Sequence, residues 1–276
     1  MRLRRKIVTL LGRDEPRFSE GDLETLREAK RRLEHPSLTA KLTALLGRPL
    51  ESGFKMLPAK WHKTIGAATE TALLKGLEYS LMTMRRVETH RSRDRLHKAL
   101  VVASGATGGA LGVAALPVEL PLSTCLMLRS IADIARSEDH DLSRIEVKLA
   151  CLEVFALGGK PAKDDAGESA YWLVRGALSK YVTEAVNHLA GKGLTDRTAP
   201  ALLRFVSQIA SRFGVVVTEQ AAAIAIPIVG AAAGGAINYL FLDHFQDMAR
   251  GHFVVKRLET KYGTALVRKT YDELAV

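Results

Sequence analysis

The sequence predicts an all-α protein, built as a single helical domain around two central glycine- and alanine-rich helices. Apolar residues recur every three or four positions through most of the 276-residue chain, which is the period of an amphipathic helix. No segment alternates polar and apolar residues over a strand length. The triplet 215–217 (Val-Val-Val) has strand-like composition but no evident partner strand. Two long uncharged runs, residues 99–118 and 221–242, provide the central helices.

Local signals place the helices in order along the chain. Ser19 is a helix cap, and Pro36 bounds the helix that follows it. A second short helix covers residues 38–46 and ends at Gly47. A longer one begins near Leu57, and a turn is expected at residues 119–121. Further helices are expected at residues 122–135, 143–157, 171–189, 201–213, 243–262 and 264–274, with a loop at 160–168.

The chain is expected to divide near residue 50. Residues 1–50 are interpreted as a basic N-terminal extension with short helices, and residues 51–276 as the main all-α domain. The N-terminus has too short an apolar stretch for a signal peptide, and both cysteines, Cys125 and Cys151, fall in apolar helical patterns. These features favour a reducing, cytoplasmic location.

Glycine spacing in the two uncharged runs predicts close helix packing of the glycine-zipper kind. A glycine inside a helix costs about 1 kcal/mol against alanine, and close approach of a second helix can offset that cost. The amide of a buried asparagine near the glycines can bond across the contact. The residues expected to pack in this way are Gly105, Gly108, Gly109 and Gly112 in the first run, and Gly230, Gly234 and Asn238 in the second.

A net charge of +10 favours anionic partners, namely phospholipid, acidic protein or nucleic acid. Aromatic residues make up 6% of the chain and no zinc-finger, basic-zipper or RNA-binding motif occurs, which disfavours nucleic acid. A basic segment directly before the first run is typical of a membrane-surface anchor, although a solvated helix face explains it equally well. Its cations are Arg85, Arg86, Arg91, Arg93, Arg95 and Lys98.

Two blocks of residues resemble the EcsC family of bacterial proteins. The first joins the glycine-rich run to Leu116, Pro117, Glu119, Pro121, Leu128, Arg129 and residues 131–136. The second comprises Ile226, Pro227, Gly230, Ala231, Gly234, Asn238, Asp243, Ala249, His252, Phe253, Arg257, Leu258, Tyr262 and Gly263. The resemblance covers roughly residues 60–265 and leaves the first 50 or so outside. It implies a helical, membrane-associated protein and supplies no catalytic residues.

Few residues suggest catalytic or ligand-binding chemistry. The glycines lack the lysine and hydroxyl residue of a phosphate-binding loop, and no zinc-binding motif occurs, so no metal or cofactor is expected. Asp243 and His252 are candidates for a polar site at the end of the second run. Glu119 is either an exposed loop residue or a buried carboxylate paired with Arg129, provided that the chain reverses at Pro121.

The two runs are long enough to span a bilayer but poor in large aliphatic residues, so burial in a helical hairpin competes with membrane insertion. The leading hypothesis is a non-enzymatic peripheral protein of the inner membrane face that binds anionic lipid or a membrane protein such as a transporter. The alternative is a soluble enzyme or carrier of hydrophobic ligands. Its pocket would be a glycine-lined groove, with Glu119, Asp243 or His252 as the polar group.

Overall fold

The computed structural model describes residues 18–34, 38–47, 49–58, 60–83, 112–159, 169–192, 199–226 and 231–275. This part of the chain forms a single helical domain without strands, which confirms the expected all-α fold. Its helices are α2 (Glu20–Glu34), α3 (Leu38–Leu46), α4 (Glu51–Met56), α5 (Lys60–Thr83), α7 (Leu116–Ser137), α8 (Ile145–Leu157), α9 (Ala170–Lys192), α10 (Pro200–Ala225), α11 (Ala231–Tyr262) and α12 (Thr264–Glu273), with a 3₁₀ turn η1 (Gly112–Ala115) before α7.

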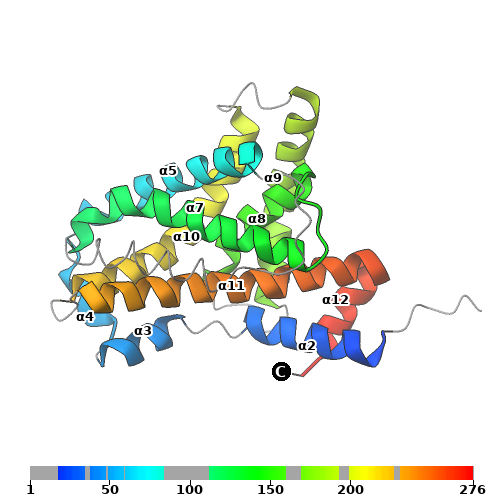
Figure 1. Ribbon diagram of the computed structural model, residues 1–276, viewed down its shortest axis with the longest axis horizontal. Coiled ribbons are helices and arrows are strands. Elements are labelled where there is room, and N and C mark those ends of the chain that lie inside the picture. Colours follow the sequence, from blue (N-terminus) through cyan, green and yellow to red (C-terminus); the bar gives the residue numbers. More distant parts are fainter. Residues whose placement is uncertain are drawn as a thin grey trace, which may run out of the picture.

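Helix α11 is the axis of the molecule (Figure 1). Its 32 residues correspond to about 48 Å, and α2, α3, α7, α8, α10 and α12 all pack against it. Helices α2 and α3 lie along one side, and α7 lies along the other with α5 beyond it. Gly263, at a φ of 86°, ends α11 in the left-handed region that glycine adopts without strain and lets α12 fold back.

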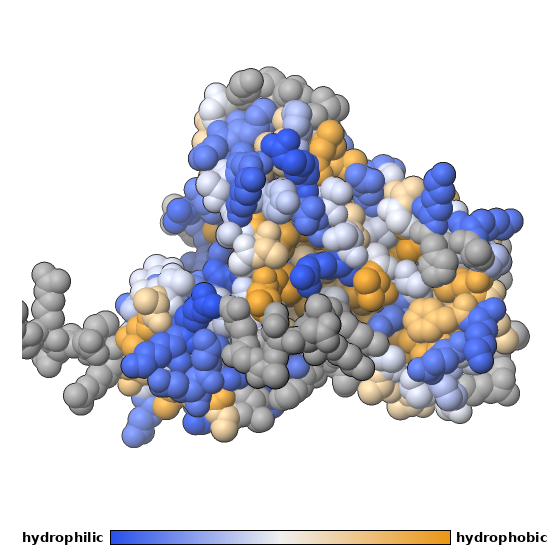
Figure 2. All heavy atoms as spheres, turned by 180° about the vertical axis from the view of Figure 1, so that it is seen from behind, coloured by the Kyte–Doolittle hydropathy of each residue, from blue (hydrophilic) through white to orange (hydrophobic). Residues whose placement is uncertain are grey.

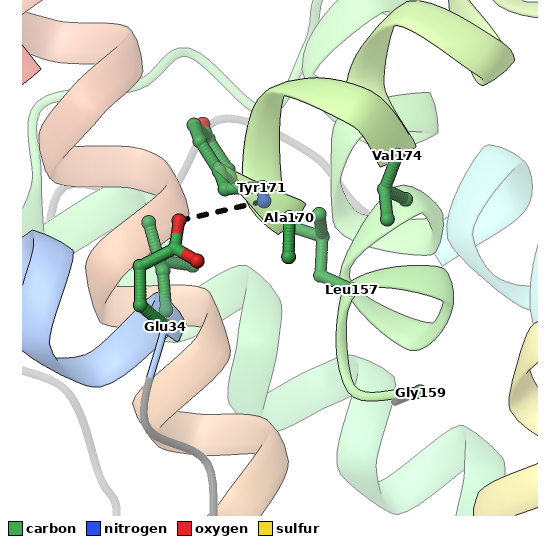
Figure 3. A pocket seen from close by; sticks show the side chains of 7 residues that line it. Glu34, Leu157, Gly159, Ala170, Tyr171 and Val174 are labelled. Carbon is green, nitrogen blue, oxygen red and sulfur yellow. Dashed lines mark hydrogen bonds between the residues drawn. The ribbon is translucent and has the colours of Figure 1, made fainter. Parts of the chain in front are cut away.

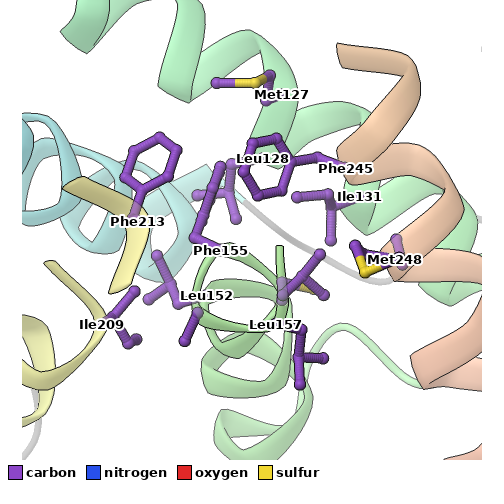
Figure 4. Packing of buried hydrophobic residues seen from close by; sticks show 14 of the residues in the cluster. Met127, Leu128, Ile131, Leu152, Phe155, Leu157, Ile209, Phe213, Phe245 and Met248 are labelled. Carbon is purple, nitrogen blue, oxygen red and sulfur yellow. The ribbon is translucent and has the colours of Figure 1, made fainter. Parts of the chain in front are cut away.

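The core is centred on α8, where every residue from Leu149 to Leu157 is buried. Phe155 of α8 meets Phe213 of α10 with ring centroids 4.8 Å apart, and Phe245 of α11 at 5.3 Å (Figure 4). Side chains of α7, including Ile131, close the same cluster. Tilted ring pairs at these separations contribute about 0.5–1.5 kcal/mol each beyond the area they bury.

Helix α2 belongs to this core. Ser19 caps it as expected, since its Oγ accepts a hydrogen bond from the backbone N–H of Asp22 at 3.1 Å. Leu26, Ala29 and Leu33 are buried against the rest of the domain. The division expected near residue 50 therefore does not coincide with a break in the hydrophobic core.

The turn expected at residues 119–121 is wrong. Helix α7 starts at Leu116 and passes through Pro121 without reversing. Pro117 lies in the first turn, where backbone N–H groups have no helical partner, and Pro121 removes only one helical hydrogen bond near the same end. Similarly, the expected helix 201–213 extends to Ala225 and incorporates the valine triplet.

The second uncharged run is not the single helix that we expected. Ala221–Ala225 end α10, Ile226 is extended with a ψ of 122°, and α11 starts at Ala231. Pro227 explains the break, because a proline pushes the preceding residue out of the helical region. Of the first run, residues 99–111 lie outside the described part, and η1 and the start of α7 form the rest.

Several close helix contacts occur at glycines that the spacing argument did not select. A Cβ on Gly53 of α4 would lie 2.0 Å from the carbonyl oxygen of Ala222 in α10. A Cβ on Gly251 of α11 would lie 2.6 Å from Cγ of Leu33 in α2. Gly234 is buried in α11, whereas Gly105, Gly108, Gly109 and Gly230 lie outside the described residues and Gly112 is in η1.

Candidate functional site

The buried polar residues of α11 form hydrogen bonds to several neighbouring helices. His244 Nε2 lies 2.9 Å from the carbonyl oxygen of Gly158 at the end of α8. Gln246 Nε2 donates to Ser130 Oγ of α7 at 2.7 Å. Since these side chains are buried, each hydrogen bond offsets a desolvation cost and also fixes how far one helix is shifted along another.

Glu119, which is partly buried near the N-terminal end of α7, accepts a hydrogen bond from a pair of buried amides. Asn238 Nδ2 donates to Glu119 Oε1 at 2.7 Å, and Gln220 Nε2 donates to Asn238 Oδ1 at 2.7 Å. Asn238 thus bonds across helices, as its position predicted, and joins α7, α10 and α11.

Arg129 is not the partner of Glu119. The two residues are ten positions apart on the continuous helix α7, about 15 Å along its axis. Arg129 Nη1 instead donates to the hydroxyl oxygen of Tyr79 in α5 at 3.2 Å. The pairing required a chain reversal at Pro121 that does not occur.

Asp243 and His252 do not form a common site. Nine residues separate them on α11, which is about 13 Å along the helix axis. Asp243 pairs with Lys41 of α3, with 3.2 Å between Oδ2 and Nζ. His252 faces α8 and α9 instead. Among the described residues, no three His, Cys, Asp or Glu side chains converge to hold a metal ion.

His252 is fully buried and belongs to a polar network. The hydroxyl oxygen of Tyr171 in α9 lies 3.1 Å from His252 Nδ1, within hydrogen-bond distance, and accepts a hydrogen bond from Arg175 at 3.3 Å. Arg175 forms a two-pronged ion pair with Glu259 at 3.0 and 3.1 Å. His252 Nε2 faces Glu153 Oε2 of α8 at 3.9 Å. The hydrogen bonds of the network fasten α9 to α11.

Burial sets the protonation states of this network. It lowers the pKa of His252 well below the usual value, and the nearby Lys256 and Arg175 charges lower it further. Burial also raises the pKa of the Glu153 carboxyl, so that its neutral form is favoured. The histidine is therefore neutral and adds no buried charge to the core.

A second polar group adjoins this network at the C-terminal end of α2 (Figure 3). Glu34 Oε1 accepts hydrogen bonds from the Ser169 hydroxyl at 2.5 Å, the Tyr271 hydroxyl at 2.8 Å and the backbone N–H of Tyr171 at 3.4 Å. The cavity beside Glu34 and Tyr171 has a volume of about 20 Å³, which is room for one water molecule. Nothing the size of a metabolite fits there.

The buried polar clusters are therefore structural. A general acid or base must come within hydrogen-bond reach of its substrate, and His252 has no exposed surface. The larger concavity, a groove of about 550 Å³ along α2, is wide open and lined by charges of both signs, including Glu28, Arg32 and Arg250. Neither this groove nor the small cavity beside Glu34 has the shape of an enclosed, mainly apolar ligand pocket.

Exposed apolar side chains gather at one end of the molecule. Of the nine large hydrophobic residues exposed in the described part, six come from α3, α4 and the N-terminal halves of α7 and α11. These elements meet at the left of Figure 1. The same end is at the right of Figure 2, which shows hydrophobic side chains in orange among hydrophilic ones in blue. The six residues, here named the apolar end, are Leu45, Phe54, Met56, Val118, Leu122 and Tyr239.

Three lysines accompany the apolar end. Lys55 lies between Phe54 and Met56 in α4, and Lys60 and Lys63 lie in the first turn of α5. All three are exposed, and none forms an ion pair with a described residue. They are distinct from the basic segment 85–98, which lies outside the described residues and follows α5 after about 36 Å of helix.

Comparison with known proteins identifies the family. The sequence profile of the EcsC protein family matches residues 20–258. This protein belongs to the EcsC family. Searches among curated proteins and among solved structures each gave no match. The family match starts at α2, some forty residues earlier than the resemblance suggested, and so includes the helix that packs along α11.

The polar residues of the second EcsC block are mostly inter-helix contacts of α11. Besides Asn238, Asp243 and His252, Arg257 pairs with Glu138 after α7 at 3.1 Å. Tyr262 donates its hydroxyl proton to Asp22 of α2 at 2.6 Å. The polar residues of this block therefore specify how the other helices dock on α11. This role explains why polar residues recur at these positions in an otherwise apolar segment.

Among the described helices, α10 has the length and composition of a membrane span. In its most apolar 18-residue window, 39% of the residues are buried inside the protein. Core helices of globular proteins meet the same criterion, so this similarity carries no conclusion about spanning.

The sequence-based predictions did not include the residues of α4, nor the lysines of α4 and of the first turn of α5. The signal was present in Phe54-Lys55-Met56 and in Lys60-Trp61, because aromatic and lysine side chains alternating over a few residues are typical of a membrane interface. Glycine spacing did not select this segment, because it is short and its one glycine, Gly53, has no glycine partner four residues away. Whether its apolar side chains are exposed depends on how α4 packs.

Proposed function

We propose that this EcsC-family protein is a non-enzymatic peripheral protein of the cytoplasmic membrane face, and that it binds anionic lipid through its apolar end. The observation that carries the proposal is the gathering of exposed apolar residues at one end, beside three unpaired lysines. Apolar patches on a protein surface commonly mark interaction sites, and lysines near an anionic leaflet contribute about 1 kcal/mol each.

The lack of a sealed pocket beside the polar clusters supports a binding role over catalysis or ligand transport. The open groove along α2 is polar, and the cavity beside Glu34 and Tyr171 has room for one water molecule only. No described feature favours a carrier of hydrophobic ligands over a membrane-binding protein. The glycine-lined groove that the carrier hypothesis requires falls mainly on residues outside the described part.

The test is co-sedimentation of the full chain, purified without detergent, with vesicles of phosphatidylcholine alone or with phosphatidylglycerol. We expect binding only to the anionic vesicles, and we expect it to weaken as salt rises, because the Debye length shortens from about 10 Å at 0.1 M to about 3 Å at 1 M. No binding at low salt would refute the proposal. Binding to salt-washed membranes but not to lipid vesicles would assign the apolar end to a membrane protein instead.

A further inference from the structure

We infer that α4 and the first turn of α5 form a rigid interfacial anchor, which sets the protein end-on against the bilayer. Phe54 and Met56 enter the boundary of the acyl chains, and Lys55, Lys60 and Lys63 bind the phosphates of anionic phospholipids. The inference rests on the proposed function, and it specifies the segment that enters the lipid, the headgroup chemistry and the orientation.

Packing fixes the direction in which α4 presents its side chains. Gly53 lies directly on α10, where a Cβ would come within 2.0 Å of the Ala222 carbonyl oxygen. Because successive helical residues are turned by about 100°, a helix held down at position 53 turns Phe54 to the side and Lys55 to the opposite face, while Met56 lies about 60° from the contact. Phe54 and Met56 are accordingly 38% and 48% exposed, with Lys55 exposed between them.

The chemistry of this segment suits the membrane interface. An aromatic ring and a thioether provide apolar surface, and lysines can lay their methylene chains along it while the ammonium groups stay with the headgroups. The acidic residue of α4, Glu51, lies in its first turn, and Lys55, Lys60 and Lys63 outnumber it. Lys41 of α3 differs from them, because Asp243 neutralises it.

Lipid suits this surface better than a second copy of the chain. In a symmetric dimer the same patch occurs on both subunits, so the three lysines of one copy would face those of the other. An anionic bilayer supplies the opposite charge instead. With six residues α4 is about 9 Å long, which matches the depth of interfacial burial and is far too short to span the hydrocarbon core.

The two tryptophans of the chain report on the orientation. Trp61 lies in the first turn of α5, directly after the anchor residues of α4. Trp172 is buried beside Tyr271 of α12, with ring centroids 5.5 Å apart, and Figure 1 places α12 and α4 toward opposite ends of the molecule. Trp172→Phe leaves Trp61 as the sole indole, and Trp61→Phe leaves Trp172.

The test measures indole fluorescence of both single-tryptophan proteins with anionic vesicles that contain brominated lipid. We expect quenching and a blue shift for Trp61 and no change for Trp172. If co-sedimentation persists while Trp61 is unaffected, or while Trp172 is quenched equally, the anchor is wrong and the proposed function stands. If the parent chain does not bind these vesicles, the proposed function itself fails.

Matched variants separate the anchor from overall charge. Replacing Lys55, Lys60 and Lys63 by glutamine should weaken vesicle affinity roughly 100-fold, since each lysine contributes about fivefold. Replacing three exposed lysines elsewhere by glutamine changes the net charge equally. The vesicle affinity of this control variant should stay within about threefold of the parent's. The control positions are Lys75, Lys180 and Lys269. An equal loss in both triples would overturn the inference.

The apolar half of the anchor is tested in the same way. The double variant Phe54→Ser and Met56→Ser should lose about tenfold in affinity, because both side chains leave water on binding. Its control is Leu203→Ser with Val215→Ser, two residues of α10 with similar exposure outside the apolar end. All four positions are exposed, so the folds should survive, which circular dichroism checks. If the α4 variant binds like its control, Phe54 and Met56 do not enter the bilayer.

Discussion

Replacing Gly251 by alanine should destabilise the protein, although alanine is the better helix former. Gly251 lies where α11 crosses α2, inside a 32-residue helix. The added Cβ would sit 2.6 Å from Cγ of Leu33 and 3.0 Å from the carbonyl oxygen of Ala29. Both distances are shorter than a relaxed carbon contact, and the second involves backbone that cannot rotate away.

Gly176→Ala is the matched control. Gly176 is also helical, but a Cβ there meets nothing within 4 Å. Each substitution gains the helix-propensity difference of about 1 kcal/mol, so that gain cancels when the two variants are compared. The difference between them is then the overpacking cost at the α2–α11 contact, about 1–3 kcal/mol.

The assay is urea unfolding of both variants and the parent, followed by circular dichroism. We expect Gly176→Ala to unfold at higher urea than the parent and Gly251→Ala at lower urea than Gly176→Ala. The corresponding gap in melting temperature is about 2–4 °C per kcal/mol. If Gly251→Ala is as stable as Gly176→Ala, then α2 does not pack on α11 as described.

Three further predictions concern the buried network, the thiols and the basic segment. Because the folded pKa of His252 lies well below 6.5, the unfolded chain binds its proton first as the pH falls, and stability is lost below about pH 6.5. Between about pH 7 and 5, the free energy of unfolding measured in urea should therefore fall less for His252→Gln than for the parent. An equal fall in both proteins would contradict this. Cys151 is fully buried, and burial raises the pKa of its thiol, so maleimide should modify it only in denaturant; because Cys125 is only partly buried, the test uses a Cys125→Ser variant, and rapid labelling of that variant in its native state would refute the burial of Cys151. Neutralising Arg91, Arg93 and Arg95 together should weaken binding to anionic vesicles by up to about 1 kcal/mol per residue, and unchanged co-sedimentation would exclude that segment.

Helix positions were predictable because their signals are local. The Ser19 cap, Gly47 after α3 and Gly263 after α11 all lie within a few residues of the ends they define. Apolar spacing likewise placed Ile65 and Leu73 on the buried face of α5. Propensity and capping act over one or two turns, so a single sequence contains enough information to locate them.

The prolines show where local signals fail. Pro121 suggested a turn, yet α7 continues through it, because a proline near the start of a helix costs little and packing against α5 and α11 holds the helix together. Pro227 does break its segment, between α10 and α11. Residue type alone did not distinguish the two positions; Pro121 lies near the start of a helix, whereas Pro227 follows the end of one.

The sequence by itself determined the all-α class, most helix boundaries and the family block on α11. Only the tertiary structure decided which side chains meet, since Glu119 bonds Asn238 and Tyr271 bonds Glu34 across more than a hundred residues. It also decided that Gly251 makes a close helix contact and that Phe54 stays exposed. Such contacts depend on how helices shift and cross in space, and spacing along one helix does not encode that arrangement.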